Sequence, residues 1–84
     1  MAPSTAYILI NCERGFEEET IKELEQLPET VEVHQIYGDS YDLVAKVNAE
    51  TPISLKKTIS SHIRKISKIN STSTLIAIEG QSFL

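Results

Sequence analysis

The sequence predicts a single α+β domain whose elements follow the order βαββαβ, with an antiparallel sheet and both helices on one of its faces. Three observations lead to this prediction. The chain has 84 residues, which leaves room for one hydrophobic core. Four short apolar runs, rich in β-branched residues, have the length of strands. Two longer segments repeat their apolar residues at the helical period of about 3.6.

The first half of the predicted fold is a strand followed by a helix. Residues 6–12 form a β-branched apolar run that ends in turn-like residues before Gly15. A helical period then begins, which predicts a helix over residues 16–27. The residues that share its apolar face are Phe16, Thr20, Leu24 and Leu27. Gly15 is an acceptable N-cap for this helix, and Pro28 ends it.

The second half is predicted to be a hairpin, a helix and a last strand. Residues 31–37 and 41–47 read as two strands joined by the turn residues 38–40. Thr51 before Pro52 predicts a helix start, and apolar residues at helical spacing carry this helix to about residue 66. Those apolar residues are Leu55, Ile59, Ile63 and Ile66. Residues 72–78 are the last strand. The domain therefore covers residues 6–80, with short tails at 1–5 and 81–84.

The order of these elements is the one found in ferredoxin-like folds. In that arrangement the first and third strands are central, the fourth lies beside the first, and the second lies at the other edge. The first strand is apolar on both faces, because Tyr7 and Leu9 point one way while Ile8 and Ile10 point the other. Two helices can cover only one face, and the other would expose an apolar patch on the order of several hundred Å². We therefore expect a dimer formed through the sheet.

The charge of the chain excludes some partners. The net charge is −4, which argues against direct nucleic-acid binding, since phosphate contacts need clustered lysine and arginine. Residues 1–42 carry ten acidic and two basic side chains, whereas residues 43–84 carry two acidic and six basic ones. This asymmetry is either an interaction device or two solvated helix faces, and the second interpretation is favoured. The sequence contains no long apolar segment, which predicts a cytoplasmic protein without membrane contact.

The sequence offers little that could support catalysis or metal binding. The single cysteine, Cys12, excludes an internal disulfide and is expected to be a small buried apolar residue. His62 falls within the apolar stripe of the second helix, where packing is its expected role, and His34 is expected at a solvated strand edge. No cluster has metal-ligand spacing, and no glycine-rich phosphate loop is present. We predict no catalytic residues, no metal and no cofactor.

Two polar segments could bind a ligand. The first is residues 37–42 at the hairpin. There Gly38 permits a backbone conformation or a close approach that a side chain would block. Tyr41 offers a ring with a hydroxyl, and Asp42 offers a carboxylate for an ammonium group. A plain turn, in which Asp39 bonds its own backbone, explains the same residues equally well. The second segment is the hydroxyl run at residues 71–74, for which an ordinary edge strand is the favoured explanation.

These segments also carry a resemblance. Residues 38–47 resemble the G-x-Y-D-hydrophobic segment of the effector-binding (RAM) domain of Lrp/AsnC-type transcription regulators. Residues 63–66 and 71–75 are similar to the end of that family's second helix and to its hydroxyl-rich last strand. The resemblance implies a ferredoxin-like fold that dimerises through its sheet and forms tetramers or larger rings. It also implies small effectors, typically amino acids, bound in clefts between dimers. The ligand residues that it implies are Gly38, Asp39, Tyr41, Asp42, Thr72 and Thr74.

The chain departs from that family in two respects. One extra residue lies between Gly38 and Tyr41, and few residues precede the first strand, so we expect no DNA-reading helix-turn-helix. The function expected is a stand-alone effector-sensing and oligomerisation module. It would either bind an amino acid as a homo-oligomer or co-assemble with full-length Lrp/AsnC-type regulators and alter their DNA binding. Two alternatives stay open: a small dimeric ferredoxin-like enzyme of the cofactor-free monooxygenase type, and a structural adaptor without a ligand.

Overall fold

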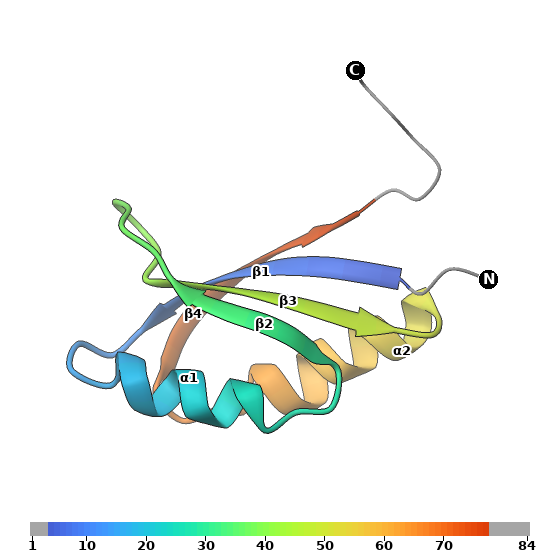
Figure 1. Ribbon diagram of the computed structural model, residues 1–84, viewed down its shortest axis with the longest axis horizontal. Coiled ribbons are helices and arrows are strands. Elements are labelled where there is room, and N and C mark those ends of the chain that lie inside the picture. The colour runs from blue at the N-terminus through green and yellow to red at the C-terminus, as the bar shows by residue number, and fades with distance from the viewer. Residues whose placement is uncertain (1–3, 78–84) are drawn as a thin grey trace, which may run out of the picture.

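The computed structural model describes residues 4–77, which form an antiparallel sheet with two helical segments on one face (Figure 1). The strands lie in the order β2-β3-β1-β4, which confirms the predicted ferredoxin-like topology. The elements in chain order are β1 (Ser4–Cys12), α1 (Glu17–Glu25), β2 (Thr30–Gln35), β3 (Leu43–Ala49), α2 (Pro52–Thr58), the π-helical turn η1 (Ile59–Ile63) and β4 (Ile69–Ile76).

The core lies between the sheet and the helices, and it is built from alternate residues of the two central strands. α1 packs over β2 and β3, whereas α2 packs over β3 and β1. The fully enclosed strand residues are Ala6, Ile8, Ile10, Leu43, Ala45 and Val47. The helices contribute Leu24, Leu55 and Ile63. The two predicted faces of β1 are confirmed, because a strand alternates its side chains. Ile8 and Ile10 face the helices and are buried, whereas Tyr7 lies on the other face and is exposed.

The structure corrects the predicted start of α1. Phe16, and not Gly15, occupies the N-cap position, and its side chain makes no capping hydrogen bond. Gly15 has a φ of 90°, a left-handed conformation that favours glycine. Its amide donates to Glu17 Oε1 at 3.0 Å, which tightens the turn between β1 and α1. Gly15 is therefore required by the turn, not by the cap.

The second helix begins as predicted but ends differently. Thr51 Oγ1 accepts a hydrogen bond from the Ser54 amide at 3.1 Å, and Pro52 occupies the first turn. The α-helix ends at Thr58, and the chain continues as the π turn η1, closed by a bond from the Arg64 amide to the Ile59 carbonyl at 3.0 Å. The wider turn shifts the helical phase. His62, predicted to pack in the apolar stripe, is exposed instead.

Strand boundaries differ from the predicted ones where polar residues join the ladder. β1 begins at Ser4, before the predicted start, and Thr5 Oγ1 donates to Asn48 Oδ1 of β3 at 2.8 Å. β4 begins at Ile69, before the predicted start, and its register with β1 shifts between Asn11 and Cys12. Ile78 and the predicted tail at 81–84 lie outside the described residues. Within residues 4–77, no helix is long and apolar enough to cross a membrane.

Candidate functional site

The predicted ligand residues of the hairpin lie at its tip and along its base. The tip rises from the sheet on the side away from the helices (Figure 1). Gly38 and Asp39 are exposed there, whereas Tyr41 and Asp42 are half-buried at the base, just before β3. The hairpin therefore presents Gly38 and Asp39 to solvent on the side of the sheet away from the helices.

Asp42 has a structural role in this chain. Its Oδ2 atom accepts hydrogen bonds from the Cys12 amide at 3.1 Å and from Asn11 Nδ2 at 3.4 Å. Asn11 Nδ2 also donates to the Ser40 carbonyl at 3.1 Å, so Asn11 ties the hairpin to the end of β1. The second carboxylate oxygen of Asp42 makes no hydrogen bond within residues 4–77. It is free to accept one from a ligand.

The structure corrects the reason given for Gly38. Its φ is not positive, and a Cβ atom built on it would approach only the Tyr41 carbonyl oxygen, at an ordinary contact distance of 3.8 Å. A side chain would therefore fit at this position. The hairpin does not depend on glycine for its backbone conformation.

The two predicted ligand threonines lie on a different part of the molecule. Thr72 and Thr74 stand on β4 opposite Ile10 and Ile8, and their side chains share the helix-covered face of the sheet with those core residues. β1 separates β4 from β3, which is two strand spacings or about 10 Å. A single chain therefore does not bring the hairpin and the threonines together.

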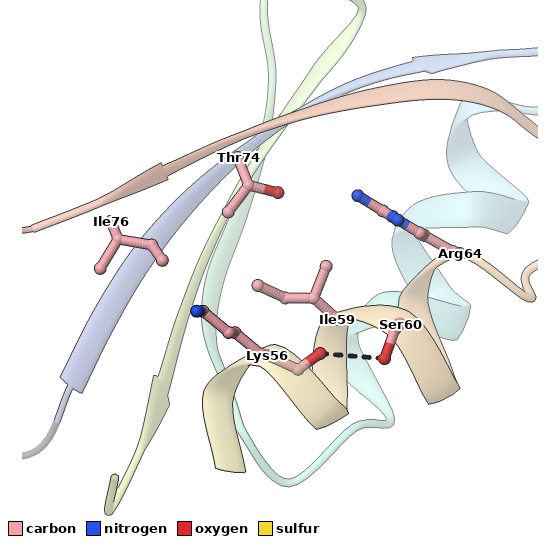
Figure 2. A pocket seen from close by; sticks show the side chains of 6 residues that line it. All are labelled: Lys56, Ile59, Ser60, Arg64, Thr74 and Ile76. Atoms are coloured by element: carbon pink, nitrogen blue, oxygen red, sulfur yellow. Dashed lines mark hydrogen bonds between the residues drawn. The ribbon is translucent and has the colours of Figure 1, made fainter. Parts of the chain in front are cut away.

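A groove lies beside these threonines, between the second helical segment and β4 (Figure 2). Its volume is about 250 Å³, and its lining residues are Lys56, Ile59, Ser60, Arg64, Thr74 and Ile76. It exists because α2 packs over the two central strands and leaves the helix-facing side of β4 only partly covered. We call it the β4 groove. At this volume it suits a molecule smaller than the drug-sized ligands that fill clefts of roughly 300–1,000 Å³.

The π turn forms one wall of the β4 groove. Ile59 and Ser60 belong to it and Arg64 closes it. Ser60 Oγ donates to the Lys56 carbonyl at 3.0 Å, so its hydroxyl is occupied within the helix (Figure 2). Single π turns in helices often occur at functional sites, because the wider turn redirects side chains. Here it directs Arg64 toward β4.

Apart from Ser60, the polar side chains that line the β4 groove have no partner among the described residues. Thr74 Oγ1 is buried and has no hydrogen-bond partner among the described residues. Lys56 and Arg64 are exposed, and neither lies within ion-pair distance of a carboxylate in residues 4–77. Sequence reasoning named Thr74 but missed Lys56 and Arg64. The available signal was their placement on either side of Ile59 along one helix.

The remaining reactive side chains do not form a catalytic or metal centre. Burial, and then the carboxylates of Asp42 and Glu17, raise the pKa of the Cys12 thiol, which keeps it protonated. Cys12 is buried, as predicted. His34 is exposed at the sheet edge, with Nε2 3.4 Å from Glu32 Oε1. Within residues 4–77, no group of three or more His, Cys, Asp or Glu side chains could hold a metal ion.

The face of the sheet opposite the helices carries a second surface. Tyr7 and Leu75 are neighbours in register and are 41% and 56% exposed. Leu9 and Val44 lie beside them, opposite each other on β1 and β3. Lys46 Nζ lies 5.9 Å from the centre of the Tyr7 ring. We call Tyr7, Leu9, Val44 and Leu75 the open-face cluster, and it is apolar at its centre.

Comparison with known proteins places this architecture in a family. The family model of the Lrp/AsnC ligand-binding domain matches residues 5–80. Among solved structures, FFRP-DM1 is 41% identical, with a TM-score of 0.85; the match covers 89% of this chain and 99% of that one. No curated protein sequence matches this chain.

Two longer proteins share the fold at lower identity. Escherichia coli AsnC is 24% identical with a TM-score of 0.84, over 96% of this chain and 54% of AsnC. A transcriptional regulator of Neisseria meningitidis, solved as a complex with L-methionine, is 8% identical with a TM-score of 0.81, over 95% of this chain and 53% of that one.

Proposed function

Because this chain belongs to the Lrp/AsnC ligand-binding domain family, we propose that it binds a small effector, an amino acid or a close analogue, and responds through its assembly. In this proposal it catalyses no reaction. The longer Neisseria meningitidis regulator of the same fold holds L-methionine, which supports an effector of that size. The volume of the β4 groove, about 250 Å³, suits the same size class.

The observation that carries the proposal is the unpaired hydroxyl of Thr74. A buried hydroxyl without a partner costs roughly 1–3 kcal/mol, so folded proteins rarely retain one without a reason. This one lies in a groove that also exposes two cationic side chains. Rotation of the Thr74 side chain would turn this hydroxyl into the groove, where a ligand carboxylate or amide oxygen would accept its hydrogen bond. Thr72 lies two residues before Thr74 on the same face of β4 and adds a second hydroxyl to this surface.

We propose that the hairpin residues Gly38, Asp39, Tyr41 and Asp42 reach the effector from a neighbouring subunit. The separation of the hairpin from the β4 threonines within one chain supports this arrangement. The free oxygen of Asp42 would then accept from the ammonium group of the ligand. Asp42→Asn should weaken binding about ten- to a hundredfold, the cost of a lost charged contact of ~1.5–3 kcal/mol. Unchanged affinity would remove the hairpin from the site.

The open-face cluster supports assembly through the sheet. Its two most exposed members, Tyr7 and Leu75, are large apolar side chains that a second copy would bury. We propose a dimer formed by two such faces, with dimers assembling into a larger ring. Light scattering on the pure protein tests this. A uniform 9.4 kDa monomer at micromolar concentration would reject it.

We propose a cytoplasmic role in which the chain modulates full-length Lrp/AsnC-type regulators by mixed assembly. The chain spans 54% of the length of Escherichia coli AsnC, which leaves the rest of that regulator without a counterpart in the match. The net charge of −4 supports the absence of direct DNA binding. In a gel-shift assay, the pure protein should not shift DNA, whereas adding it to a regulator should change the regulator's shift.

A screen of the standard amino acids by thermal shift, followed by light scattering with each hit, tests effector binding. A true effector raises the unfolding temperature in a concentration-dependent way, because it binds only the folded protein. Chromatography of the incubated effector should return it unchanged. Conversion to a product would favour the enzyme alternative, and no shift with any amino acid or related acid would reject the proposal.

A further inference from the structure

Among residues 4–77, the β4 groove carries positive charge without negative charge to balance it. Lys56 and Arg64 line it, and no lining residue is acidic. Neither cation is paired with a carboxylate in the described part of the chain. Like charges that border one hollow add their potentials, and this favours an anion inside. A ligand that neutralised both cations would carry two negative charges.

The two cations stand at opposite ends of the groove. Lys56 and Arg64 are roughly two helical turns apart, which is about 12 Å along the axis. Figure 2 shows the Arg64 guanidinium extending toward the Thr74 hydroxyl, whereas the Lys56 ammonium lies toward Ile76. Ile59 lies between them on the helical wall. The lining therefore runs from cationic to apolar to cationic.

We propose that the β4 groove binds a short dicarboxylate of the glutamate or 2-oxoglutarate type. One carboxylate would bind the Arg64 guanidinium and accept the hydrogen bond of Thr74 Oγ1, a geometry for which the planar guanidinium is suited. The other would meet Lys56. The methylene groups between them would lie on Ile59. This inference rests on the proposed effector-binding function and specifies the charge of the effector.

Among the described residues, the groove offers no carboxylate to an ammonium group. Its lining contains none, and the hydroxyls of Ser60 and Thr74 are only neutral acceptors. The ammonium of an amino acid would therefore face the open side of the groove. Comparing glutamate with 2-oxoglutarate, which lacks that ammonium, shows whether it contributes to binding. Glutamine, which has nearly the shape of glutamate and one carboxylate fewer, isolates the second negative charge.

Calorimetric titration of the full chain with glutamate, 2-oxoglutarate and glutamine tests the inference. We expect at least one dicarboxylate to bind about tenfold more tightly than glutamine, the factor expected for one charge-assisted contact at an exposed cation. Lys56→Gln should remove this preference and leave glutamine affinity unchanged. Lys57→Gln is the matched control, because Lys57 has the same charge on the same helix, is exposed, and does not line the groove.

Arg64 has an equally close control. Arg64→Gln should weaken glutamate and glutamine alike, about tenfold, because both ligands place a carboxylate there. Lys65→Gln, at an exposed neighbouring position outside the groove, should change neither. Raising the salt concentration should weaken glutamate more than glutamine, since exposed charge pairs are screened. The unfolding temperature of each variant shows that its fold is intact.

Three results would overturn the inference. Glutamine binding as tightly as both dicarboxylates would remove the need for a second cation. If Lys56→Gln and Lys57→Gln weakened dicarboxylate binding equally, the effect would come from the overall charge and not from the groove. Tight binding of a neutral amino acid, with no binding of either dicarboxylate, would contradict the dicarboxylate while leaving the proposed effector function standing. If no amino acid or related acid binds, the proposed function fails as well.

Discussion

Replacing Thr74 by valine should stabilise the free protein and weaken its binding of an effector. Valine keeps the branched shape of threonine and replaces the hydroxyl with a methyl group. Thr74 Oγ1 is buried without a partner, and such a hydroxyl costs roughly 1–3 kcal/mol. The residue as a whole is only half-buried, so we expect the lower end, about 1 kcal/mol. For a domain of this size, that raises the unfolding temperature by roughly 4–8 °C.

Thr30→Val is the matched control for this substitution. Thr30 Oγ1, at the start of β2, is also buried without a partner, and Thr30 does not line the β4 groove. Both variants should unfold at a higher temperature than the parent protein in circular dichroism. The protein concentration must be matched, because the unfolding temperature of an oligomer depends on it. Only Thr74→Val should weaken the effector, by about ten- to a hundredfold.

Two results would refute this reasoning. A lower unfolding temperature for Thr74→Val would mean that the hydroxyl makes a stabilising hydrogen bond in the free protein. Equal effector affinity in Thr74→Val and Thr30→Val would mean that the hydroxyl does not contact the ligand. Either result would leave the β4 groove without its polar anchor.

Three further predictions follow from the fold. Leu9→Glu places a charge in the open-face cluster and should give a folded monomer in light scattering. Ile8→Glu, on the buried face of the same strand, should unfold the chain. A Leu9→Glu protein that still assembles would exclude this face as the interface. Gly15→Ala should lower the free energy of unfolding by about 1–2 kcal/mol in denaturant titrations, because alanine resists a φ of 90°. Gly38→Ala should be nearly neutral, and the reverse ranking would contradict the observed backbone. The pKa of the Cys12 thiol is raised above its ordinary 9.0, so the folded protein holds this proton more tightly than the unfolded chain. The associated stability is therefore present below about pH 9, and it is lost as the pH rises through the folded pKa. Cys12→Ala should flatten that alkaline loss in urea titrations, and an unchanged pH dependence would count against it.

The sequence alone determined the order of the elements and the two faces of β1. Both follow from local rules, because alternation separates the faces of a strand and the helical period marks a helix wherever it stands. The start of α2 was equally local, since Thr51 needs only the nearby Ser54 amide to cap the helix. Polar strand ends were missed, because a residue such as Thr5 joins the ladder through its partner on β3 and leaves no apolar signal.

The sequence also identified the hairpin motif, but it did not predict what each of its residues does within the fold. Asp42 was named for its carboxylate, but only the fold shows that one of its oxygens is held by the end of β1. Gly38 was given a conformational role that belongs to Gly15. A glycine in a turn looks the same in sequence whatever its φ, because the requirement comes from the path of the chain around it.

The β4 groove was decided by tertiary structure. It depends on α2 packing over β1 and β3, which leaves the helix-facing side of β4 partly uncovered. It also depends on a π turn, whose changed hydrogen bonding breaks the helical phase that sequence reasoning assumes. Thr74, Lys56 and Arg64 were all visible in the sequence, but they come from two elements whose distance is set by packing. Periodicity reports which face a residue occupies, and only the packed fold determines what that face meets.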